Sequence, residues 1–348
     1  MGRRMRKPGK RGKVLLMLAG AAGLLGGCQA AFTPQESQAV AEDMVPPDDD
    51  SLVVVGVSQL GSESVWRTAH TASIQRAFTK ENGYFLIFEN ARQKQENQIK
   101  AIRSFISQQV DYIVFSPIME EGWDTVLQEA KEAGIPVILM DRDVKVEDET
   151  LYTTRVGSDF EEEGRRAGQW LEEYLKEQDR QEEDIHIVVL QGTEGGTSTL
   201  GRTEGFDSVA EKHENWKILE QLDGQFTTAK GKEVMEGMLL RHPDIDVVVS
   251  QNDDMTLGAL EALENAGKTT GVDGDVIVIS FDAVHKALEQ VAAGVINVDI
   301  ECNPEQGAYI EEVIQKMEAE EPVERAYYVS EEIFTQENVG DFLDNRTY

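Results

Sequence analysis

The residues best suited to chemistry in this sequence are polar groups that directly follow short apolar runs. Asp141 and Arg142 follow one such run, and Asp282 closes another. Carboxylates and guanidinium groups form charge-assisted hydrogen bonds, which are stronger than neutral ones and hold several hydroxyl groups in fixed geometry. Trp66 and Phe226 could offer flat apolar faces to the C–H surface of the same molecule. The pattern is typical of a site for a small polyhydroxylated ligand.

Polar groups also follow nearly all of the remaining apolar runs. They occupy residues 58–67, 89–93, 116–117, 191–193, 202, 223–226, 251–254 and 299–301. In an open parallel sheet, ligands bind beyond the carboxyl ends of the strands, so these groups would converge on one region. Serine and aspartate at such turns also cap the following helix, and for any single residue capping is as well supported as binding.

The elements that must position these groups alternate between short apolar runs and longer amphipathic stretches. Strands are predicted at 52–57, 84–88, 112–115, 136–140, 185–190, 216–221, 247–250, 276–281 and 297–300. Helices are predicted at 64–82, 93–109, 120–133, 160–177, 203–213, 229–240, 255–266 and 285–293. Continuous apolar strands between helices indicate parallel sheets that are buried on both faces. We expect an α/β fold with two Rossmann-like lobes, since about 300 residues exceed one core.

The N-terminal residues have the composition of an export signal. Seven basic residues and no acidic residue accompany an apolar run at 14–25, which is too short for a dedicated membrane span. Gly26, Gly27 and Cys28 resemble the lipobox of bacterial lipoproteins. We expect residues 1–27 to be removed, Cys28 to carry a lipid, and residues 28–50 to form a disordered tether. The alternative is an uncleaved signal with a chance cysteine.

The charge of the chain excludes one large class of partners. The net charge is −32, with 33 basic and 65 acidic residues, and seven of the basic residues lie in the expected signal. Nucleic acid is therefore a poor partner, because phosphate binding requires the opposite sign. We interpret the acidity as a solubility feature. Cys302 is the only cysteine besides Cys28, so an exported protein would have to rely on packed cores and not on disulfides.

Several segments occur together in a characteristic order and spacing. They are Asp141-Arg142, residues 202–206, residues 251–255 with 257–259, and Phe281-Asp282. Over about 51–335 the sequence therefore resembles the type I periplasmic-binding proteins of the ribose- and galactose-binding kind. Residues 56–59, 61–64, 66–67, 93–101 and 231–236 are similar to the galactofuranose-binding subfamily in particular.

The resemblance implies an extracytoplasmic receptor for an ABC sugar importer, which closes two lobes on one monosaccharide and delivers it to a permease and its ATPase. Galactofuranose is the first expectation for the sugar, followed by arabinofuranose or another pentose. We expect a monomer with no cofactor, anchored to the cell membrane by the lipid on Cys28. A ligand-sensing role beside a chemoreceptor or sensor kinase stays open. The effector half of a sugar-responsive repressor does not fit, because an export signal replaces the DNA-binding helices.

The resemblance also assigns roles to individual residues. Asp141 and Arg142 would bind ring and hydroxyl oxygens from the first lobe, while Arg202, Asn252 and Asp282 would do so from the second. Trp66 and Phe226 would stack on the sugar ring. Four residues would select which sugar fits: Glu63, Arg67, Gln93 and Ser116. Glu301 stands where ribose-type relatives tend to have glutamine. We expect Trp66 to be a ligand-stacking residue and not a core residue.

Three crossings between the lobes are implied near 156–158, 300–302 and 326–329. The expected lobes are therefore 51–156 with 302–326, and 157–301 with 327–348. Cys302 lies beside a crossing, and we interpret it as a small buried residue.

Other motifs in the chain are weaker. The glycine-rich stretch at 192–198 lacks the Gly-Lys-Ser/Thr of a phosphate loop, so we expect a cleft loop that ends as a helix cap. The five histidines show no metal spacing, and we expect solvated surface for each: His70, His186, His213, His242 and His285. Asp253 and Asp254 are expected to start a helix at its positive end. No nucleophile motif supports a hydrolase, so we expect no catalytic residues and no metal.

Overall fold

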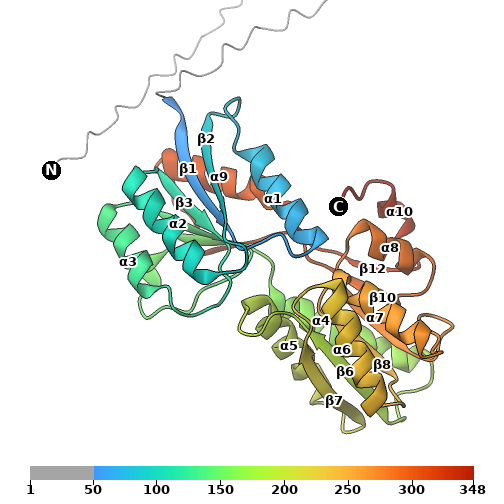
Figure 1. Cartoon of the computed structure of the whole chain (residues 1–348). Helices are drawn as coiled ribbons and strands as arrows, with labels where there is room; N and C mark the ends of the chain where they lie inside the picture. The colour runs from blue at the N-terminus through green and yellow to red at the C-terminus, as the bar shows by residue number, and fades with distance from the viewer. Residues whose placement is uncertain (1–50) are drawn as a thin grey trace, which may run out of the picture. The chain divides into compact units, whose positions relative to one another are not determined.

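The computed structural model describes residues 51–348, so the expected signal, Cys28 and the whole expected tether lie outside the described residues. Two six-stranded sheets organise this part of the chain, and helices flank each of them (Figure 1). Every strand pair is parallel except the β10–β12 pair. The predicted α/β class with two parallel-sheet lobes is confirmed.

The first lobe is built on the sheet that contains β1. In spatial order its strands are β11 (Ala326–Tyr328), β5 (Thr154–Gly157), β4 (Val137–Met140), β3 (Tyr112–Phe115), β1 (Val53–Gln59) and β2 (Tyr84–Asn90). Helices α1 (Val65–Ala77) and α9 (Gly307–Glu318) pack on one face, and α2 (Gln95–Gln108) and α3 (Asp124–Ala133) on the other. A short 3-10 helix, η2 (Glu149–Leu151), precedes β5.

The second lobe repeats this plan. Its strands, in spatial order, are β12 (Ile333–Thr335), β10 (Val298–Glu301), β9 (Ile277–Asp282), β8 (Val247–Ser250), β6 (Ile185–Gln191) and β7 (Trp216–Asp223). Helices α4 (Phe160–Glu177) and α5 (Thr197–Ala210) share one core, and α6 (Thr228–Arg241) and α7 (Asp253–Asn265) share another. Helices α8 (His285–Ala292) and α10 (Gly340–Leu343) complete the lobe.

The chain passes between the lobes where a strand of one sheet is followed by an element of the other. These passages lie at 158–159 between β5 and α4, at 302–306 between β10 and α9, and at 329–332 between β11 and β12. The last passage is later than expected, because β11 pairs with β5 and so keeps Tyr327 and Tyr328 in the first sheet. The strands β5, β11 and β12 also escaped prediction, since β11 and β12 have only three residues each and β5 has Val156 as its one large apolar residue.

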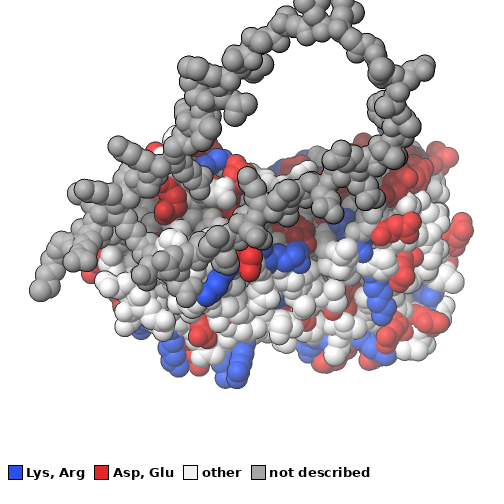
Figure 2. Space-filling model, turned by 90° about the horizontal axis from the view of Figure 1, so that it is seen from above, with Lys and Arg blue, Asp and Glu red and all other residues white. Residues whose placement is uncertain are grey.

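Charged side chains cover the surface in a mixed arrangement. Figure 2 shows basic side chains scattered among acidic ones on one face of the molecule. Exposed ion pairs such as Arg103–Glu129, at 2.8 Å, belong to this surface and contribute little to stability. Among residues 51–348, no helix combines the length and apolarity that crossing a bilayer requires.

Two buried carboxyl groups meet beneath the carboxyl end of the second sheet. Asp253 begins α7, yet its side chain accepts hydrogen bonds from Ser280 Oγ at 2.5 Å and Val284 N at 2.7 Å. Asp299 Oδ1 accepts a hydrogen bond from Ala283 N at 3.1 Å. Burial raises the pKa of Asp299 to about 7 and also raises the pKa of Asp253, which the charge of Asp299 raises further. The expected role of Asp253 at the start of a helix therefore explains only some of its contacts, since its side chain also binds Ser280 and Val284 N.

We predict that Asp299→Asn makes stability less dependent on pH. The folded pKa of Asp299 lies above its unfolded value, so the protonated form contributes stability below about pH 4 that is lost as pH rises through about 7. Asparagine keeps an acceptor for Ala283 N and a donor for Asp253 at every pH. The free energy of urea unfolding, measured from pH 4 to 8, should decline less in this variant. Exposed Asp273→Asn is the control, and equal pH slopes in all proteins would contradict the prediction.

Candidate functional site

A small cavity lies where the carboxyl ends of strands from both sheets meet. It is lined by charged, polar and aromatic side chains from both lobes: Glu63, Ser64, Trp66, Arg67, Asp141, Arg142, Phe160, Ser198, Arg202, Phe226, Asn252, Asp282 and Cys302. Asp141 directly follows β4, Asp282 ends β9, and Asn252 caps α7 after β8. The cavity thus occupies the position at which parallel sheets bind ligands.

A buried ion-pair cluster forms the first-lobe side of the cavity. Arg67 lies in the first turn of α1, which Ser64 caps by accepting a hydrogen bond from Arg67 N at 3.0 Å. Its guanidinium donates to Glu63 Oε1 at 3.0 Å and to Asp141 Oδ2 at 2.7 Å. Burial alone would raise the pKa of Asp141, but Arg67 and Arg142 outweigh it and lower this pKa to about 2. The carboxylate of Asp141 therefore stays charged and fixed in place.

A second cluster, centred on Arg202 of α5, forms the opposite side. Gly164 and Gly205 allow α4 and α5 to pack closely, because a Cβ at Gly164 would collide with the backbone of Arg202. Arg202 Nε donates to Glu163 Oε2 at 2.6 Å, and Nη2 donates to Asp282 Oδ1 at 3.2 Å. Burial opposes the charge of Arg202, but the two carboxylates raise its pKa. Burial nevertheless raises the pKa of Asp282 well above its ordinary value.

Arg142 differs from the other two arginines because much of its hydrogen-bonding capacity is unused. Its side chain is 3% exposed, and Nη1 donates to Ile118 O at 3.1 Å. Nε has no hydrogen-bond partner among the described residues, and its ion-pair contact with Asp141 Oδ2 is long, at 4.0 Å. Its guanidinium lies 5.4 Å from the ring centroid of Phe226. Burial lowers the pKa of Arg142 to about 10, helped by the neighbouring charge of Arg67. A charged donor is therefore held at the cavity wall without a full set of acceptors.

Two other cavity residues also carry buried polar atoms that lack partners among the described residues. These atoms are Glu63 Oε2 and Ser198 Oγ. A buried polar atom without a hydrogen bond costs about 1–3 kcal/mol, and such atoms are uncommon in folded proteins. Together with Arg142 Nε they are a donor, an acceptor and a hydroxyl on residues that line the same cavity. This arrangement suits a ligand that itself carries several hydroxyl groups.

Backbone strain is also concentrated at this site. Asp141, Phe226 and Asp282 have φ values of 61°, 55° and 106°, in the region that favours glycine. For an aromatic residue such as Phe226 this conformation is rare. Its ring packs over Gly192, where any Cβ would collide with it. Strained residues persist only where surrounding packing fixes them, and they are concentrated at functional sites.

Trp66 lines the cavity, but it is also part of a packed core. Its side chain is 4% exposed, its ring stacks on His70 at a centroid distance of 5.0 Å, and its indole N–H donates to Cys302 O at 2.5 Å. The same cluster includes Phe160 and Phe334 of the second lobe. The expectation that Trp66 is not a core residue is therefore wrong, because its ring fills space between segments that lie far apart in sequence.

Three predicted site residues do not line the cavity. Ser116 is fully buried behind it, where its hydroxyl donates to Asp141 Oδ2 at 2.9 Å. Gln93 has a φ of 57° and lies instead with Gly61, Ser62 and Glu63 at a separate surface hollow. Glu301 accepts hydrogen bonds from Arg346 Nη1 at 2.6 Å and from Glu332 N at 2.9 Å, so its carboxylate joins the C-terminal segment to β10.

Sequence reasoning missed four residues of the cavity wall. Ser64, Phe160 and Ser198 lie at helix starts next to predicted positions, and Cys302 directly follows β10. The only available signal was this proximity to helix starts and crossings. The expectation of a solvated His70 is also wrong, since its ring is fully buried between Gln59 and Gln306. Burial, with the nearby charge of Arg67, lowers the pKa of His70 to about 4, so the ring is neutral.

Comparison with known proteins agrees with this fold. Residues 33–317 match the model of a periplasmic binding protein domain, and the chain belongs to the periplasmic binding protein family. The galactofuranose-binding protein YtfQ of Escherichia coli is 40% identical over 255 residues, which are 72% of this chain and 78% of YtfQ. The predicted resemblance is therefore confirmed. Proteins of this kind bind substrates extracytoplasmically and are not enzymes, in agreement with the prediction.

Two solved structures are similar over most of the chain. A Mycobacterium smegmatis protein in complex with β-D-fucofuranose is 45% identical, with a TM-score of 0.80 over 85% of this chain and 95% of that one. The binding component of the arabinose ABC transporter of Shewanella sp. ANA-3, bound to α- and β-L-arabinofuranose, is 40% identical. Its TM-score is 0.79 over 84% of this chain and 95% of that one.

We predict that Trp66→Ala lowers the stability of the sugar-free protein by about 3 kcal/mol, because it removes a large buried ring and its hydrogen bond. Trp66→Phe keeps most of the packing and should lose only about 1 kcal/mol. Urea unfolding of both variants measures these losses. Wild-type stability in Trp66→Ala would show that the ring contributes nothing to the core.

Proposed function

We propose that this chain binds one monosaccharide in its furanose form in the cavity between the lobes and delivers it to an ABC permease. The observation that carries the proposal is the set of buried, unpartnered polar atoms around the cavity: Arg142 Nε, Glu63 Oε2 and Ser198 Oγ. A ligand with several hydroxyl groups satisfies such a set, whereas an apolar ligand leaves it unpaired. The lining residues come from both lobes, so a small ligand between them would contact both.

The two ion-pair clusters give the cavity its specificity in this proposal. Asp141 and Glu63, held by Arg67, accept hydrogen bonds from sugar hydroxyls on the first-lobe side. Arg202 and Asp282 bind from the opposite side, with Asn252 at the start of α7. Because each of these charged groups already has a fixed partner, sugar binding should cost little conformational entropy of the side chains.

Aromatic rings complete the proposed sugar site. Phe226 and Trp66 present apolar surface to the C–H face of the ring. The furanose form is supported by relatives that bind galactofuranose, fucofuranose and arabinofuranose. These relatives also support a role in sugar transport, since one of them is a component of an arabinose ABC transporter.

We test the sugar proposal by thermal shift of the purified chain and of Arg142→Met. The panel contains galactose, fucose, arabinose and ribose, which form furanoses in solution, and methyl pyranosides, which cannot. A sugar that binds only the native state should raise the melting temperature of the wild-type chain. Arg142→Met should weaken this binding by about 1.5–3 kcal/mol, because it removes a charged hydrogen-bond donor.

Arg103→Met is the matched control, since Arg103 is exposed and distant in the fold on α2. It should keep the full shift. A panel without any shift would contradict a monosaccharide ligand, and an equal shift in Arg142→Met would contradict the role of this cavity.

The membrane anchor belongs to the same proposal and rests on the sequence of residues 1–28. We expect Cys28 to carry the lipid that keeps a monomeric receptor near its permease. Cys28→Ser should therefore release the protein from the membrane, while Cys302→Ser should stay anchored. Partition between detergent and aqueous phases measures the difference. Wild-type partition of Cys28→Ser into detergent would contradict the anchor.

A further inference from the structure

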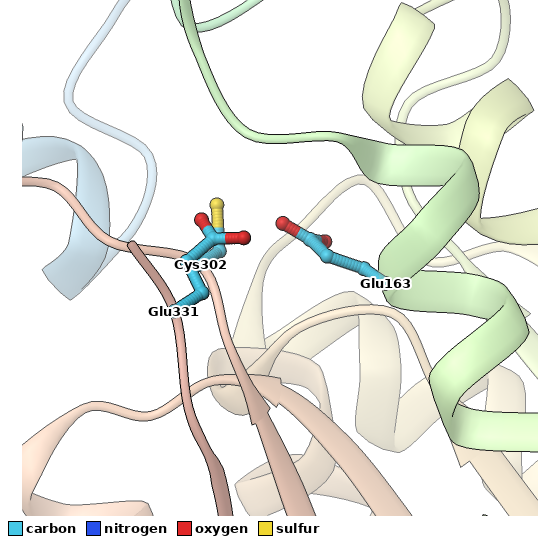
Figure 3. A group of neighbouring side chains, drawn as sticks. All are labelled: Glu163, Cys302 and Glu331. Atoms are coloured by element: carbon cyan, nitrogen blue, oxygen red, sulfur yellow. The ribbon is translucent and has the colours of Figure 1, made fainter. Parts of the chain in front are cut away.

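A group of ligand-type side chains lies beside the cavity, and neither of its two carboxylates lines the cavity. Glu163 comes from α4, Cys302 follows β10 and Glu331 precedes β12 (Figure 3). Their Sγ and carboxylate oxygen atoms lie within 4.8 Å of one another. Glu163 and Cys302 are buried, at 1% and 2% exposure. Residues far apart in sequence thus converge at the passages between the lobes.

One oxygen in this group lacks any partner among the described residues. Glu163 Oε2 accepts a hydrogen bond from Arg202 Nε at 2.6 Å, but Glu163 Oε1 accepts none. Figure 3 shows the Glu163 carboxylate pointing toward Cys302 and Glu331. An unpaired carboxylate oxygen that is fully buried is costly unless a cation or a donor faces it. Apart from the neighbouring Cys302 thiol, this oxygen is therefore open to a cation or a donor.

The surroundings of the group add more negative than positive charge. Glu331 Oε1 accepts hydrogen bonds from Ser158 Oγ and from Asn303 N, the latter at 3.0 Å. Ser158 Oγ also lies 3.3 Å from Cys302 Sγ. Arg202 faces Glu163, while the neighbouring Asp282 already shares that guanidinium. Burial raises the pKa of all three ligand-type groups, with Glu331 at about 9. Arg202 therefore offsets only part of the negative charge that the three groups would carry when deprotonated.

We propose that Glu163, Cys302 and Glu331 bind a borderline-soft divalent cation of the Zn²⁺ type. A thiolate with two carboxylates is a ligand set that such ions accept, and water can complete a four-coordinate shell. Zn–S and Zn–O bonds of about 2.3 and 2.0–2.2 Å place ligands of one ion within about 4.5 Å of each other. Small movements of the two glutamate side chains are enough to reach that geometry.

The position of the ligands gives the ion a structural consequence. Cys302 and Glu331 lie on two of the passages between the lobes, and Glu163 belongs to the second lobe. A bound ion would therefore tie both passages to α4. The cavity offers a route for the ion, since Cys302 also lines it. The proposal does not depend on which ligand the cavity binds.

Spectroscopy with Co²⁺ tests the site in the full chain carrying Cys28→Ser, in which Cys302 is the only thiol. The protein is first freed of metal with a chelator and its thiol is reduced. One Co²⁺ ion should then bind per chain and give a thiolate charge-transfer band, which added Zn²⁺ removes. Adding Cys302→Ser should abolish the band. Glu331→Gln, which preserves size, should weaken Co²⁺ binding at least about tenfold. Glu332→Gln, at the exposed neighbouring position, should leave binding unchanged.

Two results would overturn the metal site. One is the absence of the band in the Cys28→Ser chain when thiol titration after unfolding shows Cys302 to be reduced. The other is an unchanged Co²⁺ affinity in Glu331→Gln. Both readouts are made without sugar, so failure of the sugar proposal would leave them unaffected.

Discussion

The pairing of buried guanidinium groups with buried carboxylates is the interaction on which this structure depends. Arg67 and Arg202 each hold two carboxylates, at distances from 2.6 to 3.2 Å, on opposite sides of one cavity. Removing one partner of such a pair leaves an uncompensated charge and costs about 3–5 kcal/mol. The pairs therefore constrain the positions of α1, α4 and α5 as well as the chemistry of the cavity.

The fold provides the site through two repeated features. Each parallel sheet delivers polar residues at its carboxyl ends, and the passages between lobes bring these ends together. Strained backbone at Asp141, Phe226 and Asp282 fixes the direction of the side chains. Among the residues that line the cavity, the buried atoms without a hydrogen bond belong to Arg142, Glu63 and Ser198. A rigid, nearly complete hydrogen-bond network is what selects one polyhydroxylated ligand among similar ones.

Strand-end residues were predictable from sequence because apolar runs locate buried parallel strands well. Asp141 and Asp282 follow from that rule alone, while Asn252 and Arg202 were singled out through the resemblance. Gln93 was misplaced because the left-handed backbone at 92–93 belongs to a turn that periodicity does not reveal. Glu301 and Trp66 were misjudged because their partners, Arg346 and Cys302, are distant in sequence. Long-range pairing of this kind leaves no local pattern.

The most direct test of this account is a crystal structure with the sugar that gives the largest thermal shift. The account predicts one furanose ring in the cavity, with hydroxyl oxygens within hydrogen-bonding distance of Arg142 Nε and Glu63 Oε2. These atoms lack protein partners, so the sugar should supply them. A sugar bound elsewhere, or bound in the cavity with both atoms still unpartnered, would contradict the central claim that the unsatisfied network defines the binding site.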